Sequence, residues 1–196
     1  MFMSVPYSVS FNGDDAISFE TENVLVRRFQ KEDWMDLKGI AVSNANSPFA
    51  DCDESWPTED DAVQEMTEFF ANGGQFWAIE AKAVSKVVCF VNFNSIDENK
   101  TLDIGHVMNS EYLNRDYEYE GLNVLYDFAF KHYGIERIQA NWALNDVDKL
   151  APLKKLGMEV IRTFKNPKFV EKADGTKDEF DACTLVIEKT DWRCSE

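Results

Sequence analysis

Two histidines are the side chains of this 196-residue chain whose charge can change near neutral pH. His106 lies in the segment "TLDIGHVM" at 101–108, whose pattern indicates a strand. His132 stands near the end of a predicted helix, where a favourable interaction with the helix dipole explains it. His106 is therefore our candidate general base. The alternative is that its ring fills space in the core, with one nitrogen bonded to the backbone.

The segment "YLNRDYEYEG" at 112–121 precedes a long helix and is placed like an anion-binding loop. Such a loop offers glycines and backbone N–H groups at the positive end of the helix dipole. This one offers Asp116, Glu118 and Glu120. Asp116 is a favoured N-cap residue, and Glu118 is expected in the first helical turn. Either these acids occupy the helix's own N–H groups in place of an anion, or they point outward and leave those donors available.

The elements that must position these residues follow from the periodicity of the chain, which predicts an α/β layered domain with a mixed sheet. The order is strand, two helices, three strands, helix, strand, helix and a final hairpin. Residues 1–20 are expected to form an N-terminal extension and residues 21–192 a single domain. The expected strands are 23–29, 75–83, 86–96, 101–108, 136–144, 158–166 and 179–189. The expected helices are 31–44, Thr58 to Gly73, a helix that begins at Asp116, and 146–157. Met66, Phe69 and Phe70 are expected to form the apolar face of the second helix.

Composition narrows the partners. The net charge is 20 − 36 = −16, which repels nucleic acid and anionic membranes and attracts amines. The four cysteines are scattered and form no C-x-x-C pair, so we expect no metal site. The N-terminus lacks the pattern of a signal peptide, and no apolar stretch is long enough to span a bilayer. We therefore expect a cytoplasmic protein that acts as a monomer or homodimer.

Several short motifs at matching spacings resemble the GNAT superfamily of acetyl-CoA-dependent N-acetyltransferases. The series "LDIGHVMNSEYLNRDYEYEGL" at 102–122 falls on a family motif without a gap, and "RIQA" at 137–140 and "KKLGM" at 154–158 follow at the right spacings. The branch it resembles acetylates ribosomal-protein amino termini and related small amines. The likeness covers about residues 20 to 192, and each motif alone is weak.

The resemblance implies a GNAT-type acyl-CoA N-acyltransferase fold: a central mixed β-sheet flanked by helices, with a C-terminal β-hairpin. It implies acetyl-CoA as the acetyl donor and a primary amine as the acceptor: a polyamine, a small amine or a peptide N-terminus. His106, on the strand beside the acetyl group, is then the candidate base. The positions carried over to the acetyl-CoA site are Val107, Met108, Leu113, Asn114, Arg115, Asp116, Tyr117, Glu118, Asn145, Asp146 and Lys149.

The chain departs from the family pattern at the loop. Leu113 stands at a Gln or Arg position, Asp116 at the first glycine and Glu118 at a small residue. Asp146 and Lys149 stand where the branch has Asn and Ser. Two hypotheses therefore remain: an active N-acetyltransferase, or a catalytically inactive GNAT-fold binding or scaffolding module that has lost cofactor binding.

The resemblance also predicts the geometry of two strands. Strands 101–108 and 136–144 should be parallel neighbours joined by the helix that begins near Asp116. They should diverge at their C-terminal ends and open a cleft between Met108 and Trp142. Asp103 should point to the sheet face opposite His106, because side chains alternate along a strand.

Overall fold

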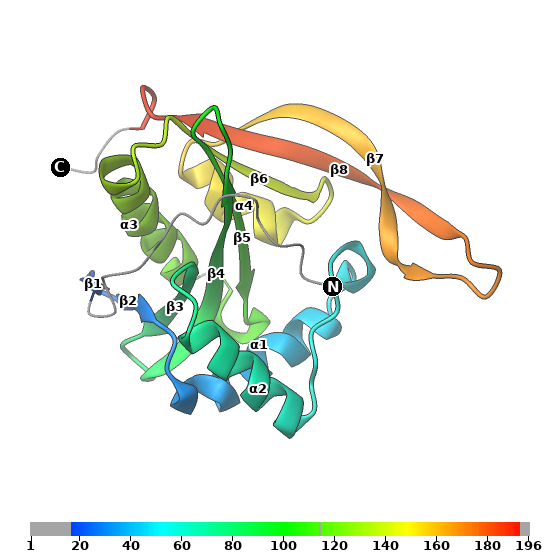
Figure 1. The fold of residues 1–196 in the computed structure, drawn as a ribbon, viewed down its shortest axis with the longest axis horizontal. Coiled ribbons are helices and arrows are strands. Elements are labelled where there is room, and N and C mark those ends of the chain that lie inside the picture. Colours follow the sequence, from blue (N-terminus) through cyan, green and yellow to red (C-terminus); the bar gives the residue numbers. More distant parts are fainter. Residues whose placement is uncertain (1–16, 114, 193–196) are drawn as a thin grey trace.

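The structure is a computed structural model that describes residues 17–113 and 115–192. Its eight strands form one mixed sheet in the order β1-β2-β3-β4-β5-β6-β8-β7 (Figure 1). Within the described residues, β5 and β6 are the only parallel neighbours. The strands are β1 (Phe19–Glu20), β2 (Val24–Arg28), β3 (Phe76–Ala81), β4 (Lys86–Ile96), β5 (Thr101–Met108), β6 (Arg137–Ala143), β7 (Glu159–Glu171) and β8 (Lys177–Glu188).

Four α-helices cover the two faces of this sheet. They are α1 (Trp34–Ala45), α2 (Asp60–Ala71), α3 (Tyr117–His132) and α4 (Val147–Lys155), with short 3-10 turns η1 (Lys31–Asp33), η2 (Ala50–Cys52) and η3 (Ser110–Tyr112). The side chains of α1 and α2 share one hydrophobic cluster with the sheet, and those of α3 and α4 share the other. None of the described helices is long and apolar enough to cross a bilayer.

The predicted α/β fold, with its mixed sheet, flanking helices and C-terminal hairpin, is confirmed. The hairpin of β7 and β8 is longer than predicted and projects from the body of the molecule as an arm (Figure 1). β1 is a short strand that the sequence did not reveal. The division into residues 1–20 and 21–192 stays a prediction, because residues 1–16 lie outside the described part.

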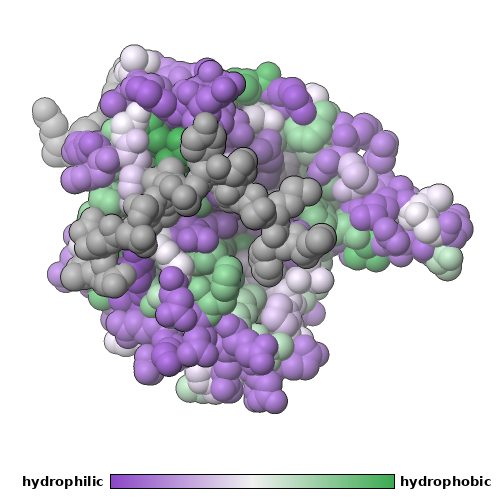
Figure 2. All heavy atoms as spheres, viewed as in Figure 1, coloured by the Kyte–Doolittle hydropathy of each residue, from purple (hydrophilic) through white to green (hydrophobic). Residues whose placement is uncertain are grey.

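The start of α2 differs from the prediction. The helix begins at Asp60, its N-cap is Glu59, and Thr58 does not cap it. Its buried stripe runs through Val63, Thr67 and Phe70, which are four and three residues apart and so share one helix face. Phe69, expected on the apolar face with Met66 and Phe70, lies beside that stripe and is 49% exposed. The view in Figure 2 shows mainly hydrophilic side chains on the outer side of α1 and α2.

α3 approaches the sheet closely at Gly121. A Cβ atom at this position would overlap the side chain of Ile79 on β3. The absence of a side chain therefore lets the helix lie against the sheet. This contact, together with the buried Leu122 and Leu125, packs the first turns of α3 against β3.

Candidate functional site

β5 and β6 separate after a short stretch of pairing. They are paired in parallel from Thr101 with Arg137 to Asp103 with Gln139, and no pairing follows although β5 continues to Met108. α3 lies between them in the chain. The predicted parallel pairing and divergence are thus confirmed, and the C-terminal halves of both strands frame a gap.

Side chains extend into this gap from both strands. The rings of His106 and Trp142 meet at 4.9 Å between centroids, with an interplanar angle of 73°. The ammonium group of Lys149, on α4, lies 4.2 Å from the centroid of the Trp142 ring. Lys149 Nζ is also 3.7 Å from Asp53, in the connection between α1 and α2. The rings of His106 and Trp142 occupy part of this gap, and the cleft expected between Met108 and Trp142 stays a prediction.

His106 is fully buried and makes its contact through one ring nitrogen. Its Nδ1 lies 2.5 Å from Oε1 of Glu118, in the first turn of α3. The Sγ atom of Cys89, on β4, is 3.7 Å from the same oxygen. The other ring nitrogen, His106 Nε2, is buried and has no hydrogen-bond partner among the described residues. The alternative in which a nitrogen is bonded to the backbone is not observed.

Neither acid of the loop occupies the helix's own N–H groups: Asp116 points outward, as the second alternative has it, and Glu118 points into the core, which neither alternative foresaw. Asp116 occupies the N-cap position but makes no capping hydrogen bond, and its Oδ1 is 2.7 Å from Lys155 Nζ instead. Glu118 turns inward to His106. The reason is geometric for Asp116, whose φ of 58° and ψ of 4° place it in the left-handed region, whereas a capping residue has an extended backbone. That conformation is the one glycine favours, so the loop keeps a glycine-like backbone.

The start of α4 contributes a second buried acid. Asp146 is the N-cap of α4, and its Oδ1 accepts the Lys149 backbone N–H at 3.2 Å. Burial raises the pKa of the Asp146 carboxyl, and the Lys149 N–H and ammonium group oppose that rise. Asp146 and His106 lie close enough for their charges to interact. The structure thus brings Glu118 and Asp146 near His106, whose ring meets Trp142 below the Lys149 ammonium group.

The remaining predicted positions contribute less through their side chains. Val107 is buried in the cluster under α1 and α2, and Tyr117 is buried in the opposite cluster. Arg115 and Asn145 are exposed. Asn114 lies outside the described residues. Met108 and Leu113 are partly buried.

Asp103 lies on the other face of β5, as alternation predicts. It accepts hydrogen bonds from Asn94 at 2.7 Å, Gln139 at 3.0 Å and Asn141 at 3.2 Å. Asn92 donates to Asn94 at 2.6 Å, and its own Oδ1 is buried without a partner among the described residues. This polar network joins β4, β5 and β6 and does not include His106.

Two other titratable side chains, Glu80 and His132, are explained by structural contacts. Glu80 pairs with Arg27 at 2.9 Å, so its carboxylate is engaged in an ion pair that also includes Asp33. His132 is the last residue of α3, as expected from the helix dipole, and its ring lies 4.8 Å from that of Phe128. Trp142 was expected to border the gap, whereas Cys89 was missed as a site residue, because nothing in the sequence singles it out.

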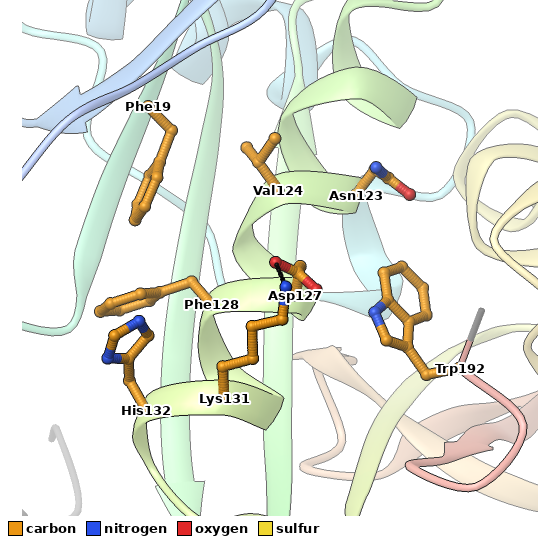
Figure 3. Close-up of a pocket in the computed structure, with 8 residues that line it drawn as sticks. All are labelled: Phe19, Asn123, Val124, Asp127, Phe128, Lys131, His132 and Trp192. Atoms are coloured by element: carbon orange, nitrogen blue, oxygen red, sulfur yellow. Dashed lines mark hydrogen bonds and ion pairs between the residues drawn. The ribbon is translucent and has the colours of Figure 1, made fainter. Parts of the chain in front are cut away.

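The two described cavities do not coincide with this cluster. One, of about 260 Å³, lies along α3 and is lined on its sides by Phe19 and Trp192, with the Asp127–Lys131 ion pair between them (Figure 3). The other, of about 530 Å³, lies between α1 and residues 109–112. Neither is lined by His106. Across the described part of the chain, no cluster of three or more His, Cys, Asp or Glu side chains is arranged to hold a metal ion.

The family described as "Acetyltransferase (GNAT) domain" matches residues 23–159, which is well over half of the chain. The chain belongs to the GNAT acetyltransferase family. The GNAT resemblance found in the motifs of 102–122 is thereby confirmed, and the parallel strands with a loop and helix between them are its structural counterpart.

Individual GNAT relatives agree with this assignment. An uncharacterized N-acetyltransferase of Bacillus subtilis (strain 168), YnaD, is 22% identical over 160 residues, which cover 82% of this chain and 92% of YnaD. The ribosomal-protein-S5-alanine acetyltransferase of Vibrio fischeri has a TM-score of 0.70 at 18% identity, over 90% of this chain and 99% of that one. The microcin C7 self-immunity acetyltransferase MccE, solved with acetyl-CoA and AMP, has a TM-score of 0.66 at 15% identity, over 86% of this chain and 93% of that one.

Proposed function

We propose that the protein is an acetyl-CoA-dependent N-acetyltransferase that acts on a primary amine, with His106 as the general base. The observation that carries the proposal is His106 Nε2. It is a buried nitrogen without a hydrogen-bond partner among the described residues, beside the gap between β5 and β6. Buried polar atoms nearly always have a hydrogen-bond partner. An exception in a family of transferases supports a catalytic role for that atom.

The N-terminal end of α3 suits the pyrophosphate of acetyl-CoA. Acetyl-CoA carries its acetyl group as a thioester. Asp116 keeps the left-handed backbone of a glycine loop, and its side chain does not cap the helix. The first turn therefore presents the positive end of the helix dipole without an acid hydrogen-bonded across it. The described residues that would hold the donor here are Leu113, Arg115, Asp116 and Tyr117, with Asn145, Asp146 and Lys149 on the other side of the gap.

His106 would act on the acceptor's amino group. Nε2 takes a proton from the ammonium form, and the amine nitrogen then forms a bond to the acetyl carbonyl carbon. The carbon–sulfur bond breaks, the thiolate of coenzyme A leaves, and the second amine proton passes to solvent or to the thiolate. An imidazolium at position 106 lies next to the Glu118 carboxylate, which balances its charge.

The class of acceptor is supported by charge. The net charge of −16 favours a cationic amine over an anionic acceptor. The Vibrio fischeri structure belongs to a protein named as a ribosomal-protein-alanine acetyltransferase, which makes a peptide N-terminus a reasonable first acceptor to examine. Polyamines are the second, because their charge is opposite to that of the chain.

A second function, a binding module without catalysis, is favoured by one observation. The Trp142 indole lies across the gap next to His106, so a donor that enters between the strands must displace it. If the indole does not move, the fold is retained without acetyl transfer.

Acetyl transfer to a panel of amines separates the two functions. The panel contains spermidine, a peptide with a free N-terminus and the same peptide with a blocked N-terminus. We expect acetylated product, detected by mass spectrometry, from at least one free amine and none from the blocked peptide. Absence of product from every amine, with the donor still intact, would support the binding module.

A further inference from the structure

We infer that Glu118 is a positioning residue, which fixes His106 with its proton on Nδ1 and leaves the lone pair on Nε2. The inference rests on the proposed function, in which Nε2 is the base. In the family pattern a small residue occupies position 118, so a long acidic side chain there is expected to weaken the pyrophosphate loop. The structure shows instead that this side chain leaves the loop and enters the core.

The position of the Glu118 carboxylate is unusual for an acid. Its side chain is only 8% exposed, and its Oε1 lies 2.5 Å from His106 Nδ1. A buried carboxylate without a partner is strongly destabilising, so the contact with His106 is needed for Glu118 to remain in the core. The first turn of α3 also favours a negative charge at this place. Glu118 Oε1 faces His106 Nδ1 at 2.5 Å and Cys89 Sγ at 3.7 Å, which suits an acceptor.

The direction of the hydrogen bond follows from the groups around that oxygen. Burial raises the pKa of the Cys89 thiol, and the charge of Glu118 raises it further, so Cys89 is an S–H donor. Its Sγ is 3.7 Å from Glu118 Oε1, the same atom that faces His106. One oxygen facing two ring or thiol donors acts as an acceptor toward both. The proton of the neutral imidazole is therefore on Nδ1, and Nε2 carries the lone pair.

The other charged groups around His106 lie on separate elements. Asp146, before α4, interacts with the His106 charge, and Lys149, on α4, lies over the Trp142 ring that contacts His106. Tyr126 lies further along α3 and is buried. Burial raises the pKa of its hydroxyl, and the charge of Glu118 raises it further. Within the described residues, Glu118 is the acid hydrogen-bonded to the His106 ring. It is therefore the group that sets the tautomer.

The first test is spectroscopic and does not depend on activity. The chain has only two histidines, so nitrogen-15 correlation spectra of the ring atoms resolve His106 from His132. We expect the neutral His106 ring in the free protein to carry its proton on Nδ1. We also expect Glu118→Gln to change the spectrum toward a mixture, because an amide can donate as well as accept. An Nε2–H tautomer in the unaltered protein would overturn the inference, even if Glu118→Gln does not fold.

The second test uses the pH–rate profile of acetyl transfer. In Glu118→Gln the imidazolium loses its balancing charge, so the acid limb should move to lower pH. The plateau should fall by about 10- to 100-fold, less than the loss expected when the base itself is removed. Asp103→Asn is the matched control, since it removes a carboxylate from the same region on the opposite sheet face and should leave the acid limb in place.

The outcomes distinguish the inference from the proposed function. An active enzyme whose acid limb is the same in Glu118→Gln overturns the inference and leaves the proposed function standing. A folded, unaltered chain that acetylates no amine overturns the proposed function and the positioning role together. Loss of plateau activity with a shifted acid limb and a changed tautomer supports both.

Discussion

The two faces of β5 carry two carboxylate networks that differ in how far their hydrogen bonds are completed. On one face, both oxygens of Asp103 accept side-chain amides, from Asn94 to Oδ1 and from Gln139 and Asn141 to Oδ2. On the other, Glu118 is bonded to His106, whose Nε2 has no partner among the described residues. The first carboxylate is fully used in joining strands. The second holds a histidine whose other nitrogen is the base in our proposal.

The largest expected effect is the loss of acetyl-transfer rate when His106 is replaced. In His106→Asn, the amide nitrogen can stand near the position of Nδ1 and still donate to Glu118, but no atom replaces Nε2. We expect the rate of acetyl transfer to fall by about 10²- to 10⁴-fold, which is the usual loss for a general base. Thermal unfolding followed by circular dichroism should show a folded protein. An unchanged rate would assign His106 to packing.

His106→Phe provides the contrast to that variant. It restores the bulk of the ring but removes the donor to Glu118, which is then buried without this partner. We expect the free energy of unfolding to fall by about 1–3 kcal/mol or more, in addition to the loss of activity. Equal stability of the Asn and Phe variants in urea denaturation would show that the bond to Glu118 contributes little.

An intermediate effect is expected at Asp103. Asp103→Asn presents an amide group to three neighbouring amides, so at least one N–H loses its acceptor. We expect the free energy of unfolding to fall by about 1–3 kcal/mol, while kcat/KM for acetyl transfer stays close to that of the unaltered chain. A loss of kcat/KM as large as that in His106→Asn would contradict the separation of the two networks.

The stability contributed by Asp103 should also depend on pH. Burial raises the pKa of the Asp103 carboxyl, and the bonds from Asn94, Gln139 and Asn141 oppose that rise. A carboxyl whose pKa is higher in the folded state stabilises the fold most at low pH, and this contribution is lost as the pH rises through the folded value. The difference in unfolding free energy between the unaltered chain and Asp103→Asn should therefore increase as the pH is lowered from 7 toward about 4. If urea denaturation gave the same difference in unfolding free energy at every pH in this range, the predicted pH dependence would be contradicted.

The smallest effect is expected at Asp116, the exposed acid of the loop, in contrast to the buried Glu118. Asp116→Gly removes a charge near the proposed pyrophosphate site and relaxes a left-handed backbone, but it also removes the ion pair with Lys155. The relaxed backbone and the lost surface pair oppose each other, so stability should change by no more than about 1 kcal/mol. Binding of acetyl-CoA should tighten by up to about tenfold at low salt and less at high salt.

Asp116→Asn is the control for that variant. Asparagine tolerates the left-handed conformation and removes only the charge, so it isolates the electrostatic part. Changing Glu118 together with Asp116 would not test the loop, because Glu118 is bonded to His106. If neither single variant alters the affinity measured by calorimetry, the charge of Asp116 does not control donor binding.

Much of the fold followed from local patterns. β5 was predicted with its observed bounds, and the divergence of β5 from β6 followed from the family motif around 102–122. Those signals lie within single segments, where periodicity and turn residues are informative. The start of α2 was misplaced because the cap is decided by backbone angles at Glu59 rather than by the presence of Thr58.

The site was less accessible from the sequence. His106 was proposed from its chemistry, but its partner was not, because Glu118 was expected either to face the helix's own N–H groups or to point outward. The inward turn of Glu118 depends on a third element, β4, which supplies Cys89, and on the burial that the sheet and α3 create together. Contacts between side chains far apart in sequence are set by packing, and one sequence does not reveal them.

The measurement that tests the account most directly is a calorimetric titration of the chain with acetyl-CoA at low and moderate salt. The account predicts binding with a Kd in the micromolar range, about −8 kcal/mol, because the first turn of α3 keeps an uncapped, glycine-like start. Affinity should fall as salt increases, since the donor is an anion. The absence of heat at millimolar acetyl-CoA, with a chain shown to be folded, would contradict the account and leave a GNAT fold that no longer binds the donor.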